Sequence, residues 1–369
     1  MSSILMRLIV TCLVILSIVY GIFQIKFQQN NQFNHFSPNW HQPVLIGNMS
    51  FSFYFIRPGT IALVHVNAGM LSMAYNLLCS LRRLNAQLLI NKIIFWAVDV
   101  EAIEHLQSYR EKNNLSFGIY HPHTRYQFSK HQNLASDGYY QMMRDRPSVF
   151  LQLLRDFHLS FIFMDADIVF TADPLSDLFL NEDRGQSEDL IYSTDARNFY
   201  DRLNDPFEKH PFIPPICGGF FLMRPTKPTI RLLEDLNKTI ARDSDANDQW
   251  TMNKLLNSRY EPINNTFIFD PTRTWLVEPL PSGLMRKNTS KRTTSSIKLR
   301  LLEQAAYING HIYGSLHDLY WNKVLESEKK NPLFKRIMIH VNTWVEDKLQ
   351  LMKRNYLWFL GPNDTCLLE

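Results

Sequence analysis

The stretch Leu159-Ser-Phe-Ile-Phe-Met-Asp-Ala-Asp167 decides the fold. Residues 159–164 are apolar except for one serine, which is typical of a strand buried in a parallel sheet, and two aspartates follow directly. Ligands of open parallel α/β sheets bind at the carboxyl ends of strands, so Asp165 and Asp167 stand where a site is expected. Burying two carboxylates without a partner is costly. Because Mn²⁺ and Mg²⁺ prefer oxygen ligands, the pair predicts a divalent metal.

Short apolar runs alternate with amphipathic stretches on both sides of this motif. Strands are predicted at residues 60–66, 92–98, 115–120, 190–194 and 218–223, and helices at 70–84, 101–112 and 137–158. Pro147 either begins the main part of the last helix or kinks it. Residues 333–339 look able to return the chain to the sheet. The alternation predicts an α/β fold, with helices flanking a Rossmann-like, mostly parallel sheet.

Composition narrows the class of protein. The chain has 369 residues, a hydrophobic content of 45% and a net charge of +4, with no basic stripe for nucleic acid. Its four cysteines, Cys12, Cys79, Cys217 and Cys366, lack the spacing of a zinc site. Any two of the last three could form a disulfide, and the sequence leaves the pair open.

The N-terminal residues predict a membrane anchor. Residues 8–25 carry no charge and are about long enough to cross a bilayer, with Arg7 before them and Lys26 after them. We expect residues 1–26 to form a short cytoplasmic tail and a transmembrane helix, 27–55 a stem, and 56–369 one catalytic domain. Asn-X-Ser/Thr sequons begin at Asn48, Asn114, Asn237, Asn264, Asn288 and Asn363. They agree with a single-pass type II protein whose catalytic domain is lumenal.

Other interpretations of the acidic pair remain open. It could be a turn that caps the following helix, or the nucleophile motif of a haloacid-dehalogenase-type phosphotransferase, which normally follows the first strand. A second Asp-X-Asp triplet, Asp243-Ser-Asp245, lies in a polar run and is predicted to be a solvated helix end or loop.

Four runs in order carry a family resemblance: FIFMDADIVFTADPL (161–175), ICGGFFLMRPT (216–226), NDQW (247–250) and IHVNTWVEDKLQLMKRNYLWFL (339–360). Together they resemble the nucleotide-diphospho-sugar transferase family, which includes plant rhamnogalacturonan xylosyltransferases, over roughly residues 60–360. The resemblance implies a glycosyltransferase A-type fold, a UDP-sugar donor, Mn²⁺ or Mg²⁺, retention of anomeric configuration, and a glycan or glycoprotein acceptor. It also implies a Golgi or endoplasmic reticulum membrane protein.

The resemblance assigns metal ligands and a basic residue. Asp165 and Asp167 match the metal motif, where Asp165 also faces the donor, and His340 matches a late histidine that completes the coordination. A histidine ligand favours Mn²⁺ over Mg²⁺. Lys348 stands where similar enzymes keep a basic residue near the diphosphate, although Glu346-Asp347 replaces the glycine that often precedes it.

Further donor contacts are expected at Asn67, at Arg146 and at Gly218-Gly219. Asn67 directly follows the first strand, and Arg146 precedes the helix that leads to the acidic motif. Arg146 could equally lie on the surface. The glycine pair lets the backbone come close to a ligand, or else forms a bulge or tight turn.

Catalytic contacts are expected at Asp248, Gln249 and Asp195. Asp248-Gln249 resembles the pair that faces sugar and acceptor in the family, although Asp248 could instead cap a helix. Asp195 ends another apolar strand and would line the acceptor site. A catalytically inactive glycan-binding protein on the same scaffold is the alternative function.

Overall fold

The computed structural model describes residues 44–46, 60–121, 137–179, 188–195, 214–243, 246–256, 274–277, 297–315, 317–342 and 348–367, which all belong to the unit Pro43–Glu369. Residues 44–46 and 274–277 are described by their backbone alone. The predicted anchor, the stem up to residue 43 and the sequons at Asn48, Asn264 and Asn288 lie outside the described residues. Among the residues that are described, no helix combines the length and the apolarity needed to cross a bilayer.

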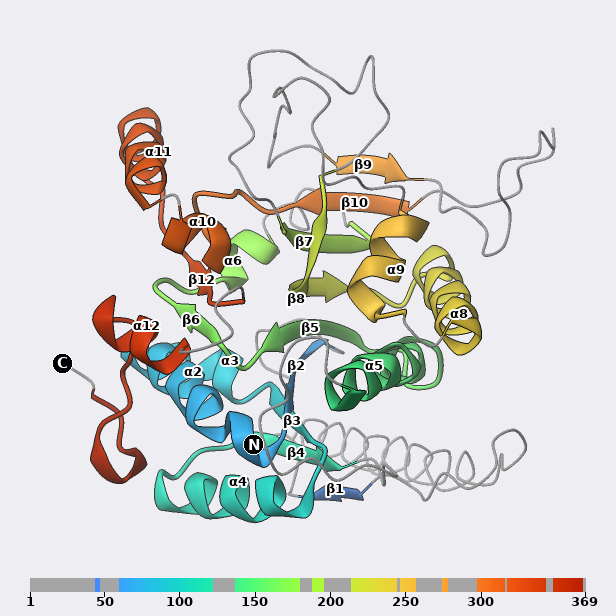
Figure 1. Ribbon diagram of the computed structural model, residues 1–369, viewed down its shortest axis with the longest axis horizontal. Coiled ribbons are helices and arrows are strands. Elements are labelled where there is room, and N and C mark those ends of the chain that lie inside the picture. The colour runs from blue at the N-terminus through green and yellow to red at the C-terminus, as the bar shows by residue number, and fades with distance from the viewer. Residues whose placement is uncertain are drawn as a thin grey trace, which may run out of the picture. The chain divides into compact units, whose positions relative to one another are not determined.

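A nine-stranded sheet forms the centre of this unit (Figure 1). Its order is β1 (Val44–Ile46), β4 (Gly118–His121), β3 (Ile93–Ala97), β2 (Thr60–Val66), β5 (Ser160–Asp165), β8 (Ile216–Met223), β7 (Leu190–Thr194), β10 (Ile297–Leu301) and β9 (Thr274–Val277). Strands β4, β3, β2 and β5 run parallel, as β7 and β10 do. Strand β8 runs antiparallel to both of its neighbours, and the edge strands β1 and β9 are antiparallel too. The mixed α/β class with a central parallel block is therefore confirmed.

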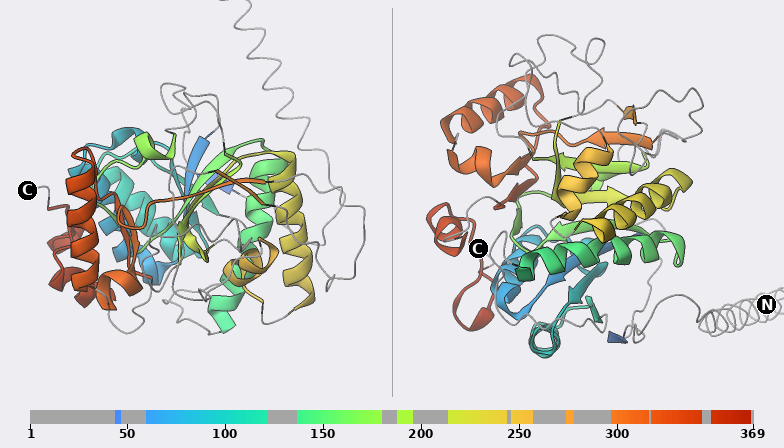
Figure 2. Two further views of the ribbon diagram at one scale, coloured as in Figure 1. Left: turned by 90° about the horizontal axis from the view of Figure 1, so that it is seen from above. Right: turned by 45° about the vertical axis from the view of Figure 1, so that its right-hand side comes forward.

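Helices cover both faces of the sheet, because successive apolar side chains of a strand point to opposite faces. Ala62, Val64 and Val66 of β2 join the core beneath α2 (Leu71–Arg83), α3 (Gln87–Ile90) and α4 (Val100–Lys112). Ile61 and Leu63 face the opposite core, with α5 (Asp137–Arg155), α8 (Lys227–Arg242) and α9 (Asp248–Leu255). Helices α5 and α8 lie side by side in both views of Figure 2. Pro147 lies inside α5, which continues on both sides of it.

A second, three-stranded sheet has the order β11 (Tyr307–Asn309), β12 (Met338–His340) and β6 (Ile168–Phe170). Val169, Ile308 and Ile339 form its core with α10 (Gly310–Ser315), α11 (His317–Lys330) and α12 (Lys348–Arg354). Residues 333–339 were predicted to return the chain to the main sheet, and that prediction named the wrong sheet. The returning strand begins only at Met338 and joins the small sheet. Three short helices complete the described elements: η2 (Ala68–Met70), α6 (Leu175–Leu178) and η4 (Pro362–Asp364).

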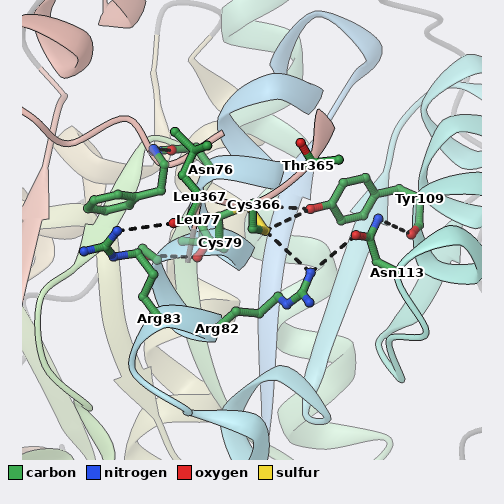
Figure 3. Close-up of a disulfide and its surroundings, with 12 residues drawn as sticks. Asn76, Leu77, Cys79, Arg82, Arg83, Tyr109, Asn113, Thr365, Cys366 and Leu367 are labelled. Carbon is green, nitrogen blue, oxygen red and sulfur yellow. Dashed lines mark hydrogen bonds between the residues drawn. A yellow bond between two sulfur atoms is a disulfide. The ribbon is translucent and has the colours of Figure 1, made fainter. Parts of the chain in front are cut away.

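One disulfide, Cys79–Cys366, ties α2 to the C-terminal segment across a separation of 287 residues (Figure 3). This result settles the pairing that the sequence left open. Among the described residues, the remaining thiol is Cys217, which is buried in β8. A further link lies nearby, because the Asn76 side chain donates to the carbonyl of Leu357 at 2.9 Å. The segment that follows β12 is thus held against α2.

Candidate metal centre

The acidic triplet forms the connection between the two sheets. Strand β5 ends at Asp165 in the large sheet, and β6 begins at Ile168 in the small one. Strand β12 pairs antiparallel with β6, with His340 opposite Ile168, and the Val341 amide donates to the Asp167 carbonyl at 3.2 Å. This pairing brings a late histidine beside an acidic motif from the middle of the chain.

Asp165, Asp167 and His340 converge on one point, and their three ligand atoms lie within 4.8 Å of one another. The His340 Nε2 atom lies 3.5 Å from Asp165 Oδ2 and 3.2 Å from Asp167 Oδ1. Adjacent ligands of an octahedral ion bound at about 2.1 Å are about 3.0 Å apart, so these separations suit a shared cation. In the described part of the chain, Asp167 Oδ1 and His340 Nε2 are buried without a hydrogen-bond partner. The residues therefore fit a divalent metal.

Each carboxylate gives its other oxygen to a basic side chain. Arg146 Nη2 lies 2.9 Å from Asp165 Oδ1, and Lys348 Nζ lies 2.5 Å from Asp167 Oδ2. Burial raises the pKa of both carboxyl groups, but these cations and His340 outweigh it and hold the pKa of each below its ordinary value. Both aspartates are therefore ionised and ready to bind a cation.

The second ring nitrogen of His340 faces Cys217, whose Sγ lies 3.3 Å from Nδ1. A proton on Nδ1 that is donated to this sulfur leaves the Nε2 lone pair directed at the two carboxylates, as a ligating imidazole requires. Burial lowers the pKa of His340, but Cys217 and both aspartates raise it, and the net pKa lies well above the ordinary value. Sequence reasoning missed Cys217, although it directly precedes the glycine pair.

Gly219 allows β8 to approach Asp165 and His340, two of the three candidate ligands, closely. A Cβ atom at this position would lie 2.6 Å from Asp165 Oδ2 and 2.7 Å from His340 Nε2, closer than real Cβ contacts come. At the neighbouring Gly218, the backbone amide donates to Gln249 Oε1 at 2.9 Å. The pairing of β7 with β8 is irregular between Thr194↔Ile216 and Tyr192↔Phe221, which agrees with the bulge that was one of the two interpretations. The approach of this backbone to a bound donor stays a prediction.

Arg146 is buried and organises the other side of the centre. Its Nε donates to His65 Nδ1 at 3.2 Å, its Nη1 lies 3.6 Å from Asp248 Oδ2, and its guanidinium lies over the Phe163 ring at 4.7 Å. The surface alternative for Arg146 was wrong, since its exposed fraction is 5%. Burial and Arg146 lower the pKa of His65, which stays neutral, and its ring lies 4.2 Å from the Trp96 ring at an angle of 32°. Sequence reasoning missed His65, although it lies near the carboxyl end of β2.

A chain of amides connects the predicted catalytic residues. Gln249 Nε2 donates to Asp195 Oδ2 at 2.8 Å, and Asn342 Nδ2 donates to Asp195 Oδ1 at 3.4 Å. Asn247 caps α9 by accepting the Trp250 N–H. The Asp248 carboxylate accepts the Gln249 N–H at 2.9 Å through Oδ1 and faces Arg146 through Oδ2. Burial raises the pKa of Asp248, although Arg146 opposes the shift. Asn342 was missed, but the histidine motif IHVN contains it.

Asn67 and Asp243 are the remaining predicted positions. Asn67 is buried directly after β2, and its carbonyl accepts the Met70 amide at 2.9 Å. Because β2 pairs with β5 so that His65 lies opposite Asp165, Asn67 lies at the same sheet edge as the acidic motif. Asp243 is exposed at the end of α8, as predicted, whereas the rest of its triplet lies outside the described residues.

Several solved glycosyltransferase structures match this chain at low similarity. They include the glycosyltransferase GlyE of Streptococcus pneumoniae TIGR4, with 12% identity, coverage of 81% of this chain and 60% of that one, and a TM-score of 0.41. Galactosyltransferase LgtC in complex with donor and acceptor sugar analogues is 11% identical, and the match covers 82% of this chain and 97% of LgtC with a TM-score of 0.41. Mouse xyloside xylosyltransferase 1 is 12% identical, and the match covers 77% of this chain and 98% of the mouse chain with a TM-score of 0.40. The chain thus spans about 60% of the length of GlyE.

Sequence comparison identifies the family. No curated protein gives a significant match to the chain. The sequence model of the nucleotide-diphospho-sugar transferases, however, matches residues 88–352, a range that contains the acidic triplet, the glycine pair, His340 and Lys348. The chain therefore belongs to the nucleotide-diphospho-sugar transferase family and carries its glycosyltransferase domain.

Proposed function

We propose that this chain transfers a sugar from a nucleotide-diphosphate donor, with UDP as the nucleotide, to a hydroxyl group of a glycan or glycoprotein. The observation that carries the proposal is the convergence of one oxygen from each of Asp165 and Asp167 with His340 Nε2. These three side chains would hold Mn²⁺ or Mg²⁺. When bound, the ion would act as a Lewis acid and stabilise the charge on the departing nucleotide diphosphate.

The charges around the centre suit a diphosphate. Two carboxylates are paired with two cations, Arg146 and Lys348, so these four charges cancel. A divalent ion added to this neutral group would leave about two positive charges to face the donor phosphates. Lys348, whose exposed side-chain fraction is 16%, can also reach a phosphate oxygen from its place beside Asp167. Asn67, Gly218 and Gly219 would complete the donor site.

The reacting sugar would lie beside the amide chain of Gln249 and Asp195. Gln249 is held at both ends, by the Gly218 amide and by the Asp195 carboxylate, so its orientation is set before substrate arrives. Asp248 is fixed by Arg146 and contacts the same region. The family resemblance favours a retaining reaction, in which the leaving phosphate itself can accept the acceptor proton and no separate general base is needed.

The test is turnover of a panel of nucleotide sugars by the purified catalytic part of the chain, with released nucleotide as the readout. UDP-xylose heads the panel because the motifs resemble plant rhamnogalacturonan xylosyltransferases. We expect turnover that chelation abolishes and Mn²⁺ restores. Asp167→Asn should lower it by orders of magnitude, whereas the matched Asp243→Asn should not.

Two other outcomes would replace the proposal. Binding of a sugar nucleotide without turnover would indicate an inactive glycan-binding protein. Hydrolysis of a phosphoester without a sugar donor would indicate a phosphotransferase. Full transferase activity in excess chelator would remove the metal from the mechanism.

We further propose that the chain is a single-pass type II protein of the Golgi or endoplasmic reticulum membrane. Residues 8–25 would be the anchor, and the catalytic domain would be lumenal. The Cys79–Cys366 disulfide supports this placement, since disulfides persist in oxidising compartments. Protease protection of the catalytic domain in sealed microsomes is expected, and digestion from the cytosolic side would reverse the orientation.

A further inference from the structure

Three sequons lie entirely within the described residues, and their surroundings differ. The first begins at Asn114, which follows Asn113, the C-cap of α4, and has a left-handed backbone with a φ of 50°. Asparagine adopts this conformation more readily than most residues. Asn114 and Ser116, the first and third residues of the triplet, are both exposed. A turn of this kind presents the carboxamide to solvent.

The second sequon, at Asn363, has the same features. Asn363 also has a left-handed backbone, with a φ of 56°, and lies in the short helix η4. Asn363 and Thr365 are exposed. The Thr365 hydroxyl donates to the Pro362 carbonyl at 2.8 Å, which closes the turn and leaves the asparagine side chain outside it.

The two turns are neighbours on one face of the molecule. Lys112, at the end of α4, donates to the Asn363 carbonyl at 2.8 Å. Arg82 donates to Asn113 at 3.3 Å and to Cys366, and Figure 3 shows Asn113 near Tyr109 and the disulfide. The disulfide ties the segment that carries Asn363 to α2, and Arg82 of α2 links both to Asn113, the neighbour of Asn114.

The third sequon, at Asn237, provides an internal contrast. Asn237 lies in the middle of α8 and is half-buried, and its Oδ1 accepts from the Ser148 hydroxyl at 3.2 Å. Ser148 belongs to α5, the helix against which α8 packs. A transferase acting on the folded chain would have to break this contact and open the helix to reach the carboxamide.

We infer that Asn114 and Asn363 are N-glycosylation sites and that Asn237 is not. The carboxamide nitrogen forms a bond to C1 of an oligosaccharide that the host transferase takes from a lipid diphosphate. The bond from C1 to the diphosphate oxygen breaks, the lipid diphosphate leaves with the electron pair, and the nitrogen releases one proton to a base. This inference rests on the lumenal placement proposed above and not on the transfer reaction.

The experiment uses the full chain produced in a eukaryotic secretory host, with occupancy at each asparagine measured by glycopeptide mass spectrometry. We expect glycans on Asn114 and Asn363 and none on Asn237. Asn114→Asp and Asn363→Asp, which keep a side chain tolerant of the left-handed turn, should each remove one glycan and increase gel mobility. Asn237→Asp is the matched control and should change neither the number of glycans nor the gel mobility.

Ser116→Ala provides a second variant, because it removes the first sequon while Asn114 stays in place. A bare Asn114 or Asn363, or a glycan on Asn237, would overturn the inference. Nucleotide-sugar turnover is measured on the same preparation. Turnover with bare Asn114 and Asn363 would overturn this inference alone, and glycosylated but inactive protein would overturn only the proposed reaction.

Discussion

Replacing Gly219 with alanine tests the close approach of β8 to the metal ligands. The added Cβ would lie 2.6 Å from Asp165 Oδ2 and 2.7 Å from His340 Nε2. His340 Cε1 would lie closer still. An ordinary contact needs about 3.4 Å, so Asp165 Oδ2 and His340 Nε2 must move by at least about 0.7–0.8 Å and the His340 ring by more, whereas metal–ligand distances tolerate only about 0.2 Å. Lesser changes around a metal site cost about 10–100-fold in affinity, and we expect a loss of at least that size for Mn²⁺. The crowding should also lower the free energy of unfolding by about 1–3 kcal/mol.

Isothermal titration with Mn²⁺ measures the affinity, and thermal unfolding confirms that the variant folds. Gly218→Ala is the matched control, because its Cβ would meet Gln249 Oε1 at 3.1 Å and none of the three ligands. It should keep the Mn²⁺ affinity and lower turnover. Wild-type Mn²⁺ affinity in Gly219→Ala, or an equal loss in both variants, would refute the reasoning.

Three further results are expected. Lys348→Met should raise the KM for the nucleotide sugar, and this loss of donor binding should exceed any loss in the free energy of unfolding when both are expressed as free energies. A KM equal to that of the wild type in steady-state kinetics would contradict this role. Cys366→Ser should lower the free energy of unfolding by about 2–5 kcal/mol in denaturant titration, because the disulfide closes a long loop; unchanged stability would show that the bond is dispensable. The raised pKa of His340 lets a proton compete with the metal, so Mn²⁺ affinity should rise with pH until the pH passes the pKa of His340 in the folded chain, which lies well above its ordinary value. The same proton stabilises the metal-free fold. This contribution is complete below the ordinary histidine pKa of about 6.5 and is lost as the pH rises through the folded pKa, so metal-free stability should fall over that range. His340→Gln should abolish both trends in pH-resolved calorimetry.

Strong apolar runs made much of the large sheet predictable. The predicted strands at residues 60–66 and 190–194 coincide with β2 and β7, and the strand before the acidic motif is shifted by one residue. Turn-forming residues bound these runs on both sides, which sharpens their ends. The antiparallel direction of β8 was not predictable, because strand direction depends on partners and not on the apolar pattern of the strand itself.

The small sheet and part of the site lay beyond sequence reasoning. Strands β6, β11 and β12 have three residues each, which is too short for an apolar period to register. His340 was placed beside the aspartates through family resemblance and not through any local pattern. Cys217 and Asn342 contribute through tertiary contacts that no spacing encodes. The disulfide pair, likewise, depends on how two distant segments meet.

His340 and Lys348 lie far from the acidic triplet in the sequence, and this separation has a consequence for biosynthesis. During translation, Asp165 and Asp167 leave the ribosome well before His340 and Lys348. A partly synthesised chain already contains Arg146, the partner of Asp165, but Asp167 lacks the imidazole and ammonium groups that complete the centre. Such late, long-range contacts form slowly, and they would make capture of the proposed metal a final step of maturation. Binding of Mn²⁺ would thus report that the chain is complete and correctly folded, and incomplete chains would not consume sugar nucleotides.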